Sequence, residues 1–246
     1  MNLAPALLVG ALGLVAGGMV WVLAAMQAGK RPWRGGPACP SCGTPLRGAG
    51  WVPLIGAFAT RRCPNCATVI APGRRLAFEL VAAAYFGGAA LWLGSSRDLI
   101  ETLVFAVPLL IVLLVDWWTR LIHTSVILMG LVLGLGFALL DGPRQLLSAL
   151  GAAFGAVLVF AFFFALAALI YRNLRVVPFG LGDVYLAAMI GAMTRLPAVV
   201  SALFFGIFAA GLGGLVLLVL RRAGRRDAIP YGPYLCLGAL VILFLR

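Results

Sequence analysis

Charged residues are scarce in this chain of 246 residues, and acidic residues are the scarcest of them. Only 11% of the residues are charged, and Asp and Glu together number seven. Soluble domains carry about 25% charged residues. With 63% hydrophobic residues and a mean hydropathy of +1.10, the composition excludes a globular protein with one large core. It predicts a protein that crosses a membrane several times.

Alternating polar residues are also missing from the apolar runs, which excludes a membrane barrel of strands. The runs predict helices, because a backbone in lipid must satisfy its polar groups within the segment. The sixth run is short and rich in glycine, which predicts a helix that is buried among the others or partly broken. The predicted fold class is therefore an all-α polytopic membrane protein with about eight transmembrane helices. The approximate bounds are 4–26, 76–94, 99–115, 122–140, 145–171, 182–194, 197–220 and 229–245.

No basic residue precedes the first apolar segment, which argues against a cleaved signal peptide. The basic residues Lys30, Arg31 and Arg34 come after it instead. This order is typical of an uncleaved anchor whose N-terminus lies outside the cell.

The basic residues are divided unevenly between the loops. Fifteen of the nineteen lie in the loops that follow odd-numbered segments. By the positive-inside rule, those loops face the cytoplasm and both termini lie outside. The net charge of +12 thus reflects membrane topology. We therefore expect the chain to contact membrane lipids and not to bind nucleic acid. The other four basic residues are Arg97, Arg144, Arg195 and Arg246.

An insertion rich in Gly, Pro and Arg, residues 27–75, separates the first segment, 1–26, from a membrane core, 76–246. It contains two C-x2-C pairs separated by twenty residues. Two such pairs can complete a tetrahedral metal site, and a reducing cytoplasmic loop disfavours disulfides. We therefore predict a structural zinc site, with a metal-free or redox-active loop as the alternative. The four ligands would be Cys39, Cys42, Cys63 and Cys66.

The fifth cysteine, Cys236, stands alone in the last apolar segment, which predicts a small packing residue.

Two aspartates adjoin long apolar runs. Asp116 follows residues 109–115, and Asp183 precedes residues 184–193. An ionisable group in a membrane helix is unfavourable by a few kcal/mol or more, so both are functional candidates. The charge map places both at the cytoplasmic face. Asp183 could instead cap its helix. Asp116 lies at a helix C-terminus, where the dipole opposes a negative charge, so a partner or a function should compensate.

Two further motifs lie near helix entrances. Gly180 and Gly182 precede Asp183, and residues without side chains let a backbone approach closely. The run Ile-Pro-Tyr-Gly-Pro-Tyr at 229–234 opens the last segment, and taken alone it indicates a structured entry turn.

In combination, these motifs resemble the prepilin leader peptidases, membrane aspartic peptidases that process type IV prepilins and type II secretion pseudopilins. The resemblance covers nearly the whole chain: the cysteine loop, the first aspartate, the Gly-x-Gly-Asp motif and the closing Ile-Pro-Phe-Gly-Pro-like motif. It implies that Asp116 and Asp183 are catalytic, in the bacterial inner membrane, with the active site facing the cytoplasm. The supporting residues would be Gly180, Gly182, Pro230, Gly232 and Pro233.

The resemblance also implies the chemistry. The substrate would be a prepilin or pseudopilin whose short basic leader is cut after a glycine. One carboxylate of the pair would take a proton from water while the other donates one to the peptide carbonyl. Many members of the family then methylate the new N-terminus with S-adenosylmethionine. No Gly-rich loop of this chain supports such a cofactor site on physical grounds, so that activity rests on the resemblance.

Two departures from the family pattern bear on substrate preference and optimal pH. Tyr185 stands where Lys is common, and His123 follows Ile122 where Pro is common. His123 lies seven residues past Asp116, so a continuous helix would put both on one face, where the histidine could tune the site. The alternative is a membrane-interface residue.

Two other functions suit paired membrane aspartates: a proton- or cation-coupled transporter, and a catalytically silent assembly factor for pili or secretion. The location of both aspartates at one face and the lack of an inverted repeat argue against transport. A cleavage assay with Asp116→Asn and Asp183→Asn variants separates the three hypotheses.

Overall fold

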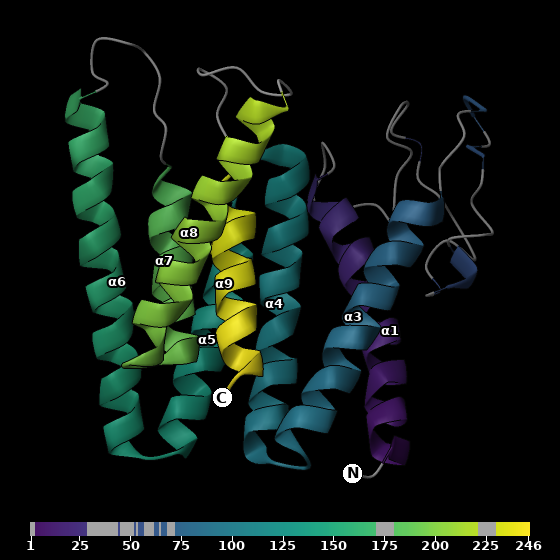
Figure 1. Ribbon diagram of the computed structural model, residues 1–246, viewed down its shortest axis with the longest axis horizontal. Coiled ribbons are helices and arrows are strands. Elements are labelled where there is room, and N and C mark those ends of the chain that lie inside the picture. The colour runs from purple at the N-terminus through teal and green to yellow at the C-terminus, as the bar shows by residue number, and fades with distance from the viewer. Residues whose placement is uncertain are drawn as a thin grey trace. The chain divides into compact units, whose positions relative to one another are not determined.

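Apolar helices dominate the computed structural model, which describes residues 3–28, 44, 52, 54–56, 62–63, 65–67, 72–170, 180–220 and 230–246. Within these ranges there are eight helices of 13 residues or more (Figure 1). They are α1 (Leu3–Ala28), α3 (Pro72–Leu93), α4 (Arg97–Thr119), α5 (Thr124–Leu140), α6 (Pro143–Ile170), α7 (Leu181–Thr194), α8 (Ala198–Val219) and α9 (Gly232–Phe244).

Five of these helices, α1, α3, α4, α6 and α8, are long and apolar enough to cross a membrane. The other three, α5, α7 and α9, are equally apolar but have 17, 14 and 13 residues. A straight crossing needs roughly 20 residues. The predicted class, an all-helical multi-pass membrane protein, is therefore confirmed. The predicted number of about eight crossings is not, because the described helices supply five, and a crossing by α5, α7 or α9 stays a prediction.

The chain divides into two compact units, Met1–Leu103 and Val104–Arg246. In the first unit, α1 and α3 lie side by side through small residues. A side chain added at Gly10 would lie 3.7 Å from the Cα of Gly87, so the two backbones are close. Small residues permit such an approach in membrane helices. Trp21 and Phe78 extend the same interface, with ring centroids 5.9 Å apart.

A buried ion pair fastens part of the long loop to α3. Glu79 is fully buried, and its carboxylate accepts hydrogen bonds from Arg75 Nε at 2.8 Å and from the backbone N–H of Leu54 at 2.9 Å. Arg75 Nη2 in turn donates to the carbonyl of Val52 at 3.0 Å. Buried charges persist when they are paired and hydrogen-bonded, and here the partners come from two segments 23 to 25 residues apart.

In the second unit, α7 is the central helix. Eleven of its residues are buried, and it contacts α5, α6, α8 and α9 (Figure 1). Small residues allow this, since a side chain at Gly191 would lie 2.7 Å from the backbone of Ala152 on α6. The prediction that the sixth segment is buried among other helices is confirmed. Asp183, in the first turn of α7, is buried as well.

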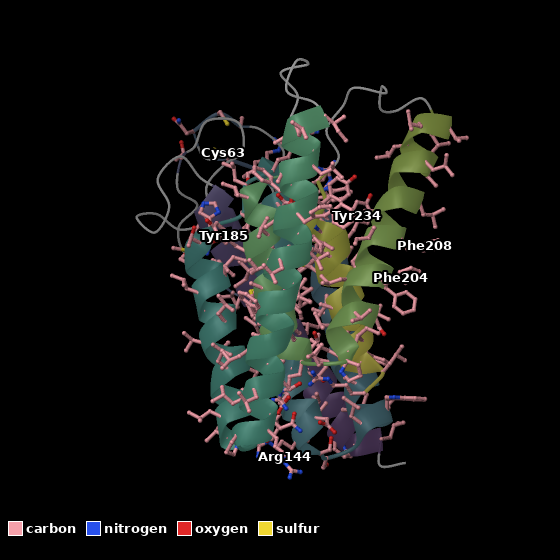
Figure 2. All side chains as sticks on the ribbon, turned by 90° about the vertical axis from the view of Figure 1, so that its left-hand side faces the viewer. Cys63, Arg144, Tyr185, Phe204, Phe208 and Tyr234 are labelled. Carbon is pink, nitrogen blue, oxygen red and sulfur yellow. The ribbon has the colours of Figure 1, made fainter. Side chains whose placement is uncertain are left out.

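Outward faces of this unit are apolar. Phe204 and Phe208 stack on the outer face of α8, with centroids 6.4 Å apart, and are 65% and 63% exposed (Figure 2). Large apolar surfaces of this kind belong against lipid or a partner.

Polar groups mark the end of α7 that lies away from Asp183. Arg195 Nη1 pairs with Asp141 Oδ2 at 2.9 Å, and Arg246 donates to the carbonyls of the last two residues of α7 at 2.8 and 3.0 Å. Figure 2 labels the two ends of the unit by Arg144 and Tyr185. Asp141, Arg195 and Arg246, which the distribution of basic residues assigns to one side of the membrane, thus lie together at the C-terminal end of α7. Which end faces the cytoplasm stays a prediction.

Candidate active site

Asp116 lies in the last turn of α4 and is 5% exposed. The helix ends there because Arg120 adopts a left-handed conformation, φ 56°, and its N–H donates to the carbonyl of Asp116 at 2.8 Å. The carboxylate of Asp116 accepts a hydrogen bond from the backbone N–H of Gly232 and is attracted by the nearby charge of Arg120. These two groups supply the compensation that a negative charge at a helix C-terminus requires.

Asp183 is the third residue of α7 and is 9% exposed. Its Oδ2 accepts a hydrogen bond from the backbone N–H of Gly180, the N-cap residue, at 3.1 Å. Asp183 therefore does cap its helix, and the positive end of the helix dipole favours its charge. Capping does not account for the carboxylate fully, because it also lies within electrostatic reach of Asp116.

The fold brings the two aspartates together although 67 positions separate them in the sequence. Their carboxylates are close enough to repel each other electrostatically. Gly232 joins the same cluster from the first turn of α9, since a side chain added there would lie 2.6 Å from Asp116 Oδ2. Three motifs predicted to form one site thus converge from α4, α7 and α9. A catalytic role for the pair stays a proposal.

The supporting residues take two positions. Gly180 and Gly182 flank the start of α7, while Pro230 precedes α9 and Pro233 lies in its first turn. Ile122 packs against Gly182, since a side chain added at Gly182 would lie 3.1 Å from the Cβ of Ile122.

Ile122 is a site residue that sequence reasoning missed. It lies between α4 and α5, and its Cδ1 is 3.3 Å from the position of a Cβ at Gly182 and 3.4 Å from that at Gly232. One methyl group therefore lies against both glycines, beside Asp116. The one hint in the sequence was that Ile122 occupies the Ile position of the Ile-Pro pair that is common in the family, where this chain has Ile122 and His123.

His123 itself is not on a helical face with Asp116, because α4 ends at Thr119 and α5 begins at Thr124. The continuous helix that would align them is absent. His123 is the N-cap residue of α5, and its Nδ1 is buried without a hydrogen-bond partner among the described residues. Tyr185, the other departure, is 50% exposed on α7.

Cys236 is fully buried on α9, as expected of a packing residue. It also lies near both aspartates.

The cysteine loop is described in part, and Cys39 and Cys42 lie outside the described residues. Cys63 is buried, Cys66 is exposed, and the turn that holds them closes with a hydrogen bond from Ala67 N to Cys63 O at 3.0 Å. Asn65 Nδ2, between the two cysteines, donates to Thr44 Oγ1 at 3.1 Å.

Thr44 follows the first cysteine pair by two residues, so this bond connects the segment after one pair to the turn of the other. That arrangement fits a four-cysteine zinc site. No cluster of three or more ligand-type side chains occurs in the ranges that the structure describes, so zinc stays a prediction.

Comparison with known proteins finds a family whose model matches most of the second unit. Residues 103–215 match the model of the type IV leader peptidase family. That range includes both aspartates, the Gly-x-Gly-Asp motif and Ile122. It excludes the cysteine loop and α9.

Curated relatives extend the similarity over most of the chain. A Bacillus subtilis protein named prepilin leader peptidase/N-methyltransferase is 29% identical over 212 residues, covering 83% of this chain and 79% of its own. Proteins of the same name from Burkholderia pseudomallei and Pseudomonas aeruginosa are 29% and 28% identical. Those matches cover 84% of this chain in both cases, and 66% and 70% of the relatives. No solved structure matches the chain. The family match and the relatives together support the type IV leader peptidase family, and a peptidase activity, for this chain.

Proposed function

We propose that this chain is an aspartic endopeptidase that removes the basic leader from prepilins or pseudopilins at the cytoplasmic face of the bacterial inner membrane. The observation that carries the proposal is the convergence of Asp116 and Asp183 in a buried cluster of unit two. The names of the relatives support the substrate. The match of 66–79% of the relatives' length leaves their whole activity a proposal for this chain.

The proposed chemistry treats the two carboxylates as a pair that shares one proton, as like charges held close together do. The ionised member takes a proton from a water molecule, whose oxygen adds to the scissile carbonyl carbon. The protonated member donates to the carbonyl oxygen. When the C–N bond breaks, the aspartate that took the proton from water gives it to the departing amine. A hydroxyl of the tetrahedral intermediate returns its proton to the other aspartate as the carbonyl re-forms, so the dyad returns to its starting state. We leave open which aspartate plays which part, because each accepts one backbone hydrogen bond.

The backbone donors hold the carboxylates for this work. Gly232 N–H fixes Asp116, and Gly180 N–H fixes Asp183. Each donor belongs to a helix start, so the packing of α7 and α9 sets the geometry of the pair.

The relatives' names include N-methyltransferase, and we extend the proposal to methylation of the new N-terminus with S-adenosylmethionine. Mass spectrometry of the cleaved product, with and without that cofactor, tests the extension. A product of unchanged mass in both samples would exclude it.

We also propose that Cys39, Cys42, Cys63 and Cys66 hold one zinc ion. With four sulfur ligands no position is left for a reactant, so the metal would order the loop and take no part in peptide cleavage.

The direct test is incubation of the purified protein with a prepilin, in parallel with Asp116→Asn and Asp183→Asn. A matched control is Asp141→Asn, which removes a carboxylate at the other end of α7. We expect cleavage by the parent and the control and none by the two site variants. Intact substrate in every tube would favour a transporter or a silent assembly factor, and cleavage by both site variants would mean that other residues are catalytic.

A further inference from the structure

An apolar side chain, that of Ile122, lies beside the dyad. Its Cδ1 lies 3.4 Å from the position that a Cβ would occupy at Gly232. Asp116 Oδ2 lies 2.6 Å from the same position. A methyl group and a carboxylate oxygen thus border the same side of Gly232.

Ile122 is also more accessible than the carboxylates. Asp116 and Asp183 are 5% and 9% exposed, whereas Ile122 is half-buried. Gly182 and Gly232, the two residues that Ile122 packs against, have no side chain of their own. A peptide that reaches the dyad past these two glycines therefore meets the side chain of Ile122.

We propose that Ile122 is a specificity-determining residue that restricts the substrate residue whose carbonyl is attacked to one with little or no side chain. This inference rests on the proposed function. In any peptide the Cα of that residue is bonded directly to the attacked carbon. Its side chain must therefore lie within a few bond lengths of the dyad, where Cδ1 of Ile122 lies. Polar contacts do not provide this selection, because a glycine and an alanine differ by one methyl group.

Two substitutions remove the obstruction in steps. Ile122→Val removes the methyl group that lies against both glycines and keeps the branched Cβ, so the fold is preserved. Ile122→Ala removes most of the side chain. Leu121→Ala is the matched control, because Leu121 is the preceding residue, is similar in size and is 63% exposed.

The experiment measures kcat/KM for two prepilin peptides that differ only in having glycine or alanine before the scissile bond. The parent should prefer glycine. Because one methylene changes discrimination in an apolar pocket by roughly tenfold or more, the alanine-to-glycine ratio should rise about tenfold in Ile122→Ala and by less in Ile122→Val. Leu121→Ala should keep the parent ratio.

The outcomes separate the inference from the function beneath it. If the parent cleaves neither peptide, the proposed function fails and the inference fails with it. If the Ile122 variants cleave the glycine peptide but keep the parent ratio, the inference alone is overturned. A folded Ile122→Val that cleaves neither peptide would also overturn it, by showing that Ile122 positions the dyad instead.

Discussion

Replacing Gly232 by alanine would disturb the dyad with a single methyl group. The new Cβ would lie 2.6 Å from Asp116 Oδ2 and 3.1 Å from its Cγ. Contacts of a Cβ below 3.0 Å essentially do not occur, so an atom must move. The backbone conformation at position 232 is compatible with alanine, since Gly232 begins α9 and is not among the glycines with positive φ.

The cheapest relief is a rotation of the Asp116 carboxylate, because it is the free end of a side chain. A catalytic group misplaced by about 1 Å can lower a rate by roughly 100-fold. We therefore expect kcat/KM to fall by about 100-fold, or about 2.7 kcal/mol in the barrier. Stability should change little, because alanine favours a helix over glycine by up to about 1 kcal/mol and offsets the local strain.

The assay combines prepilin cleavage with thermal unfolding in detergent. Gly211→Ala on α8 is the matched control, since a side chain there would meet nothing within 4 Å. We expect parent activity in the control and a parent-like unfolding temperature in both variants. Full activity of Gly232→Ala would refute the placement of this glycine against Asp116.

Three further predictions concern parts of the chain outside the dyad. Glu79→Gln removes the buried charge that pairs with Arg75, which should lower stability by roughly 3 kcal/mol and expose the loop to limited proteolysis. The similarly spaced pair of Arg97 with Glu101 is longer, at 3.8 Å, and its Arg97 side chain is 51% exposed, so Arg97→Gln should change the proteolysis pattern little. Metal analysis should find one zinc per chain, and chelation should release the loop to protease; a metal-free protein would contradict the site. Arg195→Ala breaks the 2.9 Å pair with Asp141, which should lower stability by about 2 kcal/mol and leave kcat/KM unchanged.

The helices could be predicted from the sequence because hydropathy is a local property. Each of the eight predicted apolar segments corresponds to a described helix, and the burial of α7 followed from its length and glycine content. The number of crossings was less predictable, because 13 to 17 apolar residues suit a buried helix as well as a tilted span.

The geometry of the site was beyond sequence reasoning for a different reason. The proximity of Asp116 and Asp183 depends on how α4, α7 and α9 pack, which no local pattern specifies. The end of α4 was hidden as well, because the left-handed residue that ends it is Arg120, where glycine would have been the recognisable signal. Because α4 ends before Arg120, His123 and Asp116 do not share a helical face, contrary to the expectation from a continuous helix.

The central claim is that Asp116 and Asp183 act as one unit. It is tested most directly by kcat/KM for prepilin cleavage in four proteins: the parent, Asp116→Asn, Asp183→Asn and the double variant. Residues that work as a unit lose nearly all activity singly, and the second substitution removes little more. We predict that each single variant is as inactive as the double one. Single variants that retain substantial activity, with losses that multiply in the double variant, would contradict the claim.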